Sequence, residues 1–238
     1  MKIKALAHAS FLIIRDDGFR IVTDPYEPGE MHYPAVEESA DLVIRSSADD
    51  FGHCFAEMIG GNPEVITATD LVDDSLTVAG MTIDAIGVQE SLIYKESPID
   101  NAMYCFTIDG LRIGHMGDVG NPLTESQLSG LESVDVLFAL TGGPPTLDLK
   151  DLDVVIDHVK PSIVIPMHYQ LLPDRITMFP VTDFTDRYDS QYVHFHDTAE
   201  MEISQKTLPE TLSIHVLKSS VLEQPTKTEA PVSSMKPQ

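Results

Sequence analysis

The sequence has no tryptophan and only two cysteines, Cys54 and Cys105. Two cysteines are too few for a disulfide framework, so we expect a reducing compartment and a cytoplasmic protein. Long apolar runs are also missing, because no stretch approaches the roughly 18 apolar residues that a membrane span needs. The apolar start, residues 1–14, is interrupted by His8 and continues into strand-like sequence, which is unlike a cleaved signal. We therefore predict a soluble protein with no membrane partner.

Basic residues are scarce. The chain has 15 Lys and Arg against 38 Asp and Glu, which gives a formal net charge of -23 at pH 7. Such a surface repels phosphate backbones and anionic lipid headgroups, so nucleic acid is not an expected partner. Most of the carboxylates are expected to solvate the surface, and only those at the ends of strands are candidates for chemistry.

The order of the predicted elements changes near residue 120. Before it, alternating apolar residues and turn signals such as Asp109-Gly110 predict strands over 2–6, 11–15, 19–24, 42–44, 63–69, 75–78, 81–88, 102–108 and 111–115. After it, helices over 124–131, 148–160 and 182–188 alternate with strands over 134–140, 162–167, 192–195 and 212–217. Apolar residues at three- and four-residue spacing, closed by Pro161, make 148–160 the clearest helix.

This order predicts an α+β fold in which two sheets pack together with helices outside, rather than one parallel sheet. The length fits one domain over residues 1–220. The remaining segment, 221–238, is rich in Pro, Ser, Thr and Lys, and we expect it to be disordered.

Several polar residues directly follow apolar strands, where α/β enzymes gather reactive groups. They are His8, the 49–53 cluster, Glu90, the pair His115 and Asp118, and His168. Each one alone is more often a turn or capping group. Together they are nitrogen and oxygen ligands that suit Zn²⁺ or Mn²⁺.

Six stretches of the first 170 residues also resemble a known family. They are "LAHASFLI" at 6–13, "IVTDPY" at 21–26, "ADLVIRSS" at 40–47, "GLRIGHMGDVG" at 110–120, "LTGGPPTLDL" at 140–149 and "KPSIVIPMHY" at 160–169. In this order they are similar to the metallo-β-lactamase superfamily, and within it to the ascorbate-6-phosphate lactonase-like branch. The resemblance implies a four-layer αββα sandwich of two mixed sheets, with one or two metal ions at the sheet edge.

The resemblance also assigns roles to single residues. Asp118 matches the bridging carboxylate of the family, and His168 matches the late histidine ligand. His8 matches a histidine of this branch near the pocket, and His115 matches a frequent family residue that suits a role behind the ligands or at the substrate. As catalytic residues, His8 or His115 would donate a proton to the leaving group or hold an anionic substrate.

The stretch after Ile44 departs from the family. Where the family has H-x-H-x-D-H, this chain reads Ser47-Ala-Asp-Asp-Phe-Gly-His53. In direct register Phe51 and Gly52 would stand at two ligand positions, but neither residue has a side-chain atom that can bind a metal ion. A shift by one residue instead places Asp50 and His53 in the last two roles, and we favour it because an extra loop residue costs little. Glu90 stands where the family's next histidine is expected.

The predicted ligand set is therefore Asp49, Asp50, His53, Glu90, Asp118 and His168. Its many oxygens favour hard ions such as Mn²⁺, while Zn²⁺ stays open. The implied activity is hydrolysis of a small-molecule ester, lactone or phosphorylated substrate by a metal-bound hydroxide. Backbone N–H groups at Gly142 and Gly143 could bind an oxyanion, although a plain turn is the alternative. The rival function is a catalytically inactive member of the fold that acts as a binding or assembly subunit.

Two further features lie outside this predicted ligand set. His194 and His196 in "YVHFHD" imitate an H-x-H pair, but alternation on an exposed sheet face explains them. The strand-rich rim over 100–115 could pair between subunits, which would make a homo-oligomer.

Overall fold

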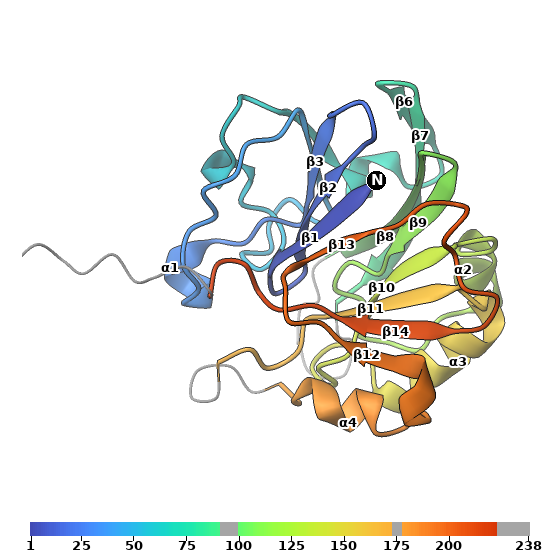
Figure 1. Ribbon diagram of the computed structural model, residues 1–238. Coiled ribbons are helices and arrows are strands. Elements are labelled where there is room, and N and C mark those ends of the chain that lie inside the picture. The colour runs from blue at the N-terminus through green and yellow to red at the C-terminus, as the bar shows by residue number, and fades with distance from the viewer. Residues whose placement is uncertain (91–99, 173–177, 223–238) are drawn as a thin grey trace, which may run out of the picture.

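The computed structural model describes residues 1–90, 100–172 and 178–222, and its strands form two sheets that pack face to face (Figure 1). The six-stranded sheet has the order β13-β1-β2-β3-β4-β5. Its strands are β1 (Lys2–Ala7), β2 (Ser10–Ile14), β3 (Arg20–Thr23), β4 (Leu42–Arg45), β5 (Glu64–Thr67) and β13 (Glu200–Glu202).

The eight-stranded sheet has the order β12-β14-β11-β10-β9-β8-β7-β6. Its strands are β6 (Ser75–Val78), β7 (Met81–Gln89), β8 (Asp100–Ile108), β9 (Leu111–His115), β10 (Val136–Leu140), β11 (Ile163–Met167), β12 (Val193–Phe195) and β14 (Ser213–Val216). The α-helices of the described residues are α1 (Pro28–Met31), α2 (Glu125–Gly130), α3 (Leu149–Val159) and α4 (Val181–Thr185). The predicted α+β sandwich of two mixed sheets is confirmed.

Both sheets contain a parallel part. In the six-stranded sheet, β3, β4 and β5 are parallel. In the eight-stranded sheet, β9, β10, β11, β14 and β12 are parallel. Parallel strands bring their carboxyl ends to one edge of a sheet, so the loops after them are gathered there. This arrangement sets the place of the polar residues described below.

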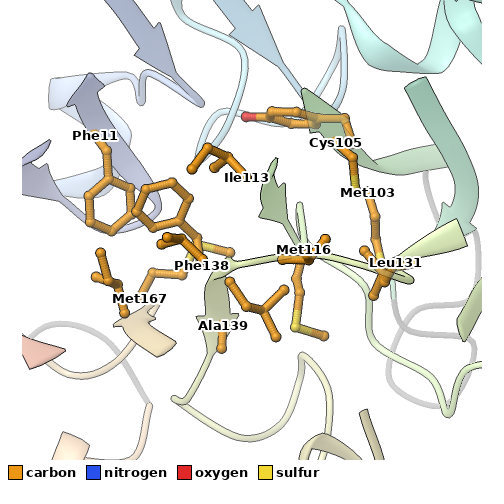
Figure 2. Close-up of a cluster of buried hydrophobic side chains, with 14 of the residues drawn as sticks. Phe11, Met103, Cys105, Ile113, Met116, Leu131, Phe138, Ala139 and Met167 are labelled. Atoms are coloured by element: carbon orange, nitrogen blue, oxygen red, sulfur yellow. The ribbon is translucent and has the colours of Figure 1, made fainter. Parts of the chain in front are cut away.

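The inner faces of the two sheets share one large apolar core. Phe11 from β2 stacks on Phe138 from β10 with ring centroids 4.2 Å apart, and Met167 of β11 lies beside them (Figure 2). Alternation along β1 and β2 directs Ile3 and Ile13 into the same core. Burial of these side chains is the main force that holds the sheets together.

The outer faces are covered differently. Five apolar residues of α3 are buried in the large core, the side chain of Asp148 accepts a hydrogen bond from the Lys150 N–H at its start, and Lys160 ends it in a left-handed conformation. The six-stranded sheet is instead covered by loop residues such as Tyr26 and Tyr33. Helix α1 has four residues and buries none of them, so loops supply most of this outer layer.

Two predictions about the periphery need correction. Strand β8 pairs with both β7 and β9, and β9 also pairs with β10, so the 100–115 rim has no free edge for a second subunit. A homo-oligomer therefore stays a prediction, but the 100–115 strands are not its interface. Val221, which we assigned to the tail, is buried against the six-stranded sheet. The rest of the predicted tail, 223–238, lies outside the described residues. None of the helices in the described part of the chain has the length and apolarity that a membrane crossing requires.

Candidate metal centre

The candidate site lies where the two sheets meet at one edge. The six-stranded sheet contributes His8, from the turn between β1 and β2, and His53, from the loop after β4. The eight-stranded sheet contributes Asp118, which follows β9, and His168, which directly follows β11. The His168 backbone N–H donates a 3.0 Å hydrogen bond to the carbonyl of His8, which joins the two halves within the site.

Three buried imidazoles form the first group of possible ligands. One ring nitrogen each of His8, His53 and His168 lies within 4.8 Å of the others. The ring centroids of His8 and His168 are 3.9 Å apart, and those of His53 and His168 are 5.5 Å apart. Both His8 and His168 adopt positive φ, at 58° and 54°, a conformation that non-glycine residues rarely take outside special sites.

A second group shares His53. The ligand atoms of Asp50, His53 and Asp118 also lie within 4.8 Å of one another. The Nε2 atom of His53 is 3.8 Å from Asp50 Oδ2 and 3.6 Å from Asp118 Oδ1. That same Asp118 oxygen is 3.1 Å from His168 Nε2. Asp118 therefore connects the two groups, as a carboxylate between two cation positions would.

Asp24 is the residue that sequence analysis missed. It is fully buried after β3, and its carboxylate accepts hydrogen bonds from the Ser46 N–H and hydroxyl, the Tyr104 hydroxyl and His53 Nδ1. Burial by itself raises the pKa of Asp24, but His115 and His53 outweigh it and lower the pKa below its usual value. The stretch "IVTDPY" contained the signal, an aspartate at the carboxyl end of a buried strand.

The hydrogen bond with Asp24 fixes the tautomer of His53 and the direction of its Nε2 atom. Because Nδ1 donates to the carboxylate at 2.7 Å, the Nε2 lone pair points away from Asp24, toward Asp50 and Asp118. A carboxylate behind a histidine is the usual support of a metal ligand. Nε2 is buried and has no hydrogen-bond partner among the residues that the structure describes.

A lone pair facing two carboxylates is unfavourable unless a positive charge lies between them. Burial lowers the pKa of His53, yet Asp50, Asp118 and Asp24 raise it to about 10. The site therefore holds a proton on Nε2 tightly, and a divalent cation can take the place of that proton. The nitrogen and oxygen donors that converge here fit Zn²⁺ or Mn²⁺.

His115 lies outside both groups, and its geometry contradicts the predicted proton-donor role. Its Nε2 donates to the carbonyl of Ala9 at 2.9 Å, and its Nδ1 accepts the Gly117 N–H at 3.1 Å. The ring is fully buried and stacked on Tyr104, and burial lowers its pKa. With both nitrogens bonded to the backbone, His115 shapes the turn before Asp118 and cannot reach a substrate.

His8 also differs from its predicted role. Burial lowers its pKa well below the usual value, and His168 and His53 lower it further. A neutral imidazole is a poor proton donor and a good metal ligand. The structure thus places His8 among the candidate ligands.

The other predicted residues lie in different surroundings. Asp49 is exposed and belongs to neither group, so of the two neighbouring aspartates only Asp50 reaches the site. Glu90 is buried, but its carboxylate is in neither group. At Gly142 a Cβ atom would collide with the His168 carbonyl, and Gly143 has φ of 67°. Close packing and backbone conformation therefore account for both glycines.

A cavity of about 580 Å³ lies next to the site. Asn101 lines it and is itself buried, and its side-chain oxygen accepts the Asp118 N–H at 3.0 Å. The histidines of the two groups do not line this cavity, so it adjoins the candidate centre through Asn101 and Val119 rather than containing it.

Comparison with known proteins relates most of the chain to one family. The family model described as the beta-lactamase superfamily domain matches residues 2–168. A UPF0173 metal-dependent hydrolase of Carboxydothermus hydrogenoformans is 26% identical over 210 residues, which cover 79% of this chain and 92% of that protein. A UPF0173 protein of Pyrococcus furiosus is 28% identical over 188 residues, covering 71% of this chain and 83% of that protein.

A solved structure extends the similarity to the whole fold. The crystal structure of a Thermotoga maritima protein of the metallo-beta-lactamase superfamily superposes with a TM-score of 0.71 at 27% identity, covering 91% of this chain and 97% of that one. The narrower lactonase branch stays a prediction. Since the family model spans most of the chain and includes both groups of candidate ligands, the chain belongs to the beta-lactamase superfamily domain family.

Proposed function

We propose that this protein is a metal-dependent hydrolase that uses Asp50, His53, Asp118 and His168, together with His8, to hold one or two divalent cations, Mn²⁺ or Zn²⁺. The observation that carries the proposal is the buried Nε2 of His53, aimed by Asp24 at two carboxylates. The three-imidazole group suits Zn²⁺, whereas the group with two carboxylates suits Mn²⁺. The name of the Carboxydothermus relative supports the reaction class.

The substrate that we propose is a small-molecule ester, lactone or phosphorylated compound. A cation bound here supplies Lewis acidity, which polarises the scissile carbonyl or phosphoryl oxygen and makes a water more acidic. Residues of the chain orient the candidate ligands. Asp24 fixes the tautomer of His53, the Asn101 side chain holds the backbone of Asp118, and His8 stays neutral and able to bind.

A second candidate function is a protein of this fold without catalysis, acting as a binding or assembly subunit. The observation in its favour is the loop after β4. In direct register with the family's H-x-H-x-D-H motif, Ser47, Phe51 and Gly52 replace residues that bind the metal ion. The two candidates differ in whether a cation is bound and whether substrate turns over.

Metal titration separates them. After removal of metal with a chelator, Mn²⁺ and Zn²⁺ are added to the wild type and to His53→Ala, and binding is followed by calorimetry and thermal unfolding. At 100 times the Kd, binding stabilises the fold by about 2.7 kcal/mol. We expect the wild type to gain this stabilisation and His53→Ala to gain less, because it lacks the share that comes from this centre, while His158→Ala, on the exposed side of α3, behaves as wild type.

Activity is then measured on a panel of lactones, carboxylic esters and phosphate monoesters. We expect hydrolysis by the metal-loaded wild type and at least a hundredfold lower rate for Asp118→Asn, since a connecting carboxylate is lost. A wild type that binds no cation contradicts the proposed centre. A wild type that binds a cation but hydrolyses no member of the panel contradicts the proposed substrate classes.

A further inference from the structure

A second set of histidines lies at the edge of the eight-stranded sheet, outside the centre described above. His194 on β12 pairs directly with His215 on β14, in a parallel register. His196 follows β12, and its N–H donates to the carbonyl of Val216 at 2.9 Å. Because side chains alternate along a strand, all three imidazoles lie on one face of this edge. The ring centroids of His194 and His196 are 5.0 and 5.1 Å from that of His215.

Alternation alone accounts for His194 and His196, which are neighbours on one short strand. It does not account for His215, which arrives from a segment 19 residues beyond His196 and places its Nδ1 2.8 Å from His196 Nε2. Two nitrogen ligands at about 2.0–2.1 Å from one tetrahedral ion are roughly 3.3 Å apart, so a small movement admits a cation between them. These two rings already stand close to the spacing of a chelating pair.

The hydroxyl of Ser213 supports one of the rings from behind. Ser213 Oγ lies 2.9 Å from His215 Nε2. When Nε2–H donates to this hydroxyl, the Nδ1 lone pair of His215 faces His196, as the supporting contact of a metal-bound histidine requires. His196 needs only to move its proton from Nε2 to Nδ1 to offer a second lone pair, and that tautomer change leaves the ring neutral.

The charge state of the rings also suits a cation. Burial, followed by His196 and His194, lowers the pKa of His215 to about 4. Burial and His194 lower the pKa of His196 as well. Neutral imidazole is the form that binds metal, and the chain's net charge of -23 attracts cations to its surface. His194 is exposed on the same face, where its side chain can turn toward the pair.

We propose that His196 and His215, completed by His194, form a separate binding site for a divalent transition ion that prefers imidazole, such as Zn²⁺ or Cu²⁺. The site does not depend on the proposed hydrolase centre. A cation held there ties the edge strand β12 to β14 across their parallel pairing.

Stoichiometry of metal binding tests the proposal. The chelator-treated full chain is titrated with Zn²⁺ alone by calorimetry, in the wild type, His196→Ala, His194→Ala/His196→Ala and His53→Ala. We expect the His196→Ala and double variants to lose one equivalent, or to bind it at least about tenfold more weakly, while keeping any equivalent held in the pocket. His53→Ala should keep the equivalent at the sheet edge. His158→Ala serves as the matched control for loss of an exposed histidine.

Electron paramagnetic resonance with Cu²⁺ gives an independent readout. A cation at this site shows hyperfine coupling to two or three imidazole nitrogens in His53→Ala, and the coupling disappears when His194→Ala and His196→Ala are added. Unchanged circular dichroism and melting temperature confirm that these variants fold. The proposal is overturned if the double variant binds as many equivalents of Zn²⁺ as the wild type, with the same affinity. It is also overturned if the copper spectrum does not change.

Discussion

Asp24 shows how one buried carboxylate can organise a candidate site through its hydrogen bonds. Four hydrogen bonds converge on it, from the backbone and hydroxyl of Ser46, from Tyr104 and from His53. The donors come from both sheets, since Ser46 follows β4 and Tyr104 belongs to β8. The orientation of the His53 ring is therefore fixed by residues of both sheets and not by its own loop alone.

Replacing this carboxylate tests its role. In Asp24→Asn the amide no longer offers two acceptor oxygens, so the tautomer of His53 is no longer fixed. We expect Zn²⁺ or Mn²⁺ affinity, measured by calorimetry, to fall about 10- to 100-fold. Asp49→Asn is the matched control, because Asp49 is exposed and lies outside both ligand groups. Equal losses in the two variants would mean that general charge, not support of His53, sets the affinity.

The two cysteines should differ in reactivity. Cys105 is fully buried, and burial raises the pKa of its thiol to about 12. Cys54 is half-buried, and its pKa is raised less, again chiefly by burial. Since the thiolate is the reactive form, we expect iodoacetamide at pH 8 to modify Cys54 while Cys105 stays unmodified, as read by mass spectrometry. Both should react in urea, and equal rates in the native state would contradict the burial of Cys105.

At the scale of elements, the sequence predicted most clearly what depends on local pattern. The apolar spacing in residues 148–160 and Pro161 located α3 almost to the residue, and most strands agree within two residues. Strand β13 escaped prediction because its three residues are partly polar and it forms only by pairing with β1 at the sheet edge. Such pairing is a tertiary effect that no short window of sequence contains.

Helix α3 offers a direct comparison of its two faces. Leu152 is fully buried, whereas Val154 is 56% exposed. Leu152→Ala removes buried methyl groups and leaves a cavity, so we expect the free energy of unfolding to fall by about 2–5 kcal/mol. Val154→Ala should change it by less than about 0.5 kcal/mol. Urea unfolding followed by circular dichroism measures both, and similar losses in the two variants would contradict the packing of α3.

The site was less predictable than the fold because its members are brought together by long-range contacts. The sequence placed His53 and Asp118 near a common edge, but it could not separate Asp50 from Asp49, which are neighbours in one loop. His115 resembled a site residue because it directly precedes the Asp118 turn, and only the backbone partners of its two nitrogens exclude that role. Hydrogen bonds of this kind leave no trace in composition or periodicity.

At the scale of the whole molecule, the charge imbalance should govern the response to salt. With a net charge of -23, like charges repel one another, and this repulsion is strongest in the compact folded state. Dissolved ions screen it. We expect the melting temperature, measured with a chelator present, to rise by a few degrees between about 20 mM and 0.5 M NaCl. KCl should act in the same way, since screening does not depend on the cation. A fall in melting temperature would show that ion pairs outweigh the repulsion.

The distribution of candidate ligands over both sheets has a consequence for cooperativity. His8 and His53 are anchored in one sheet, and Asp118 and His168 in the other. A cation shared among them acts as a noncovalent cross-link that closes long loops of the chain. Its removal should therefore accelerate amide hydrogen exchange in the turn at His8 and at the end of β11 together, rather than in either sheet alone.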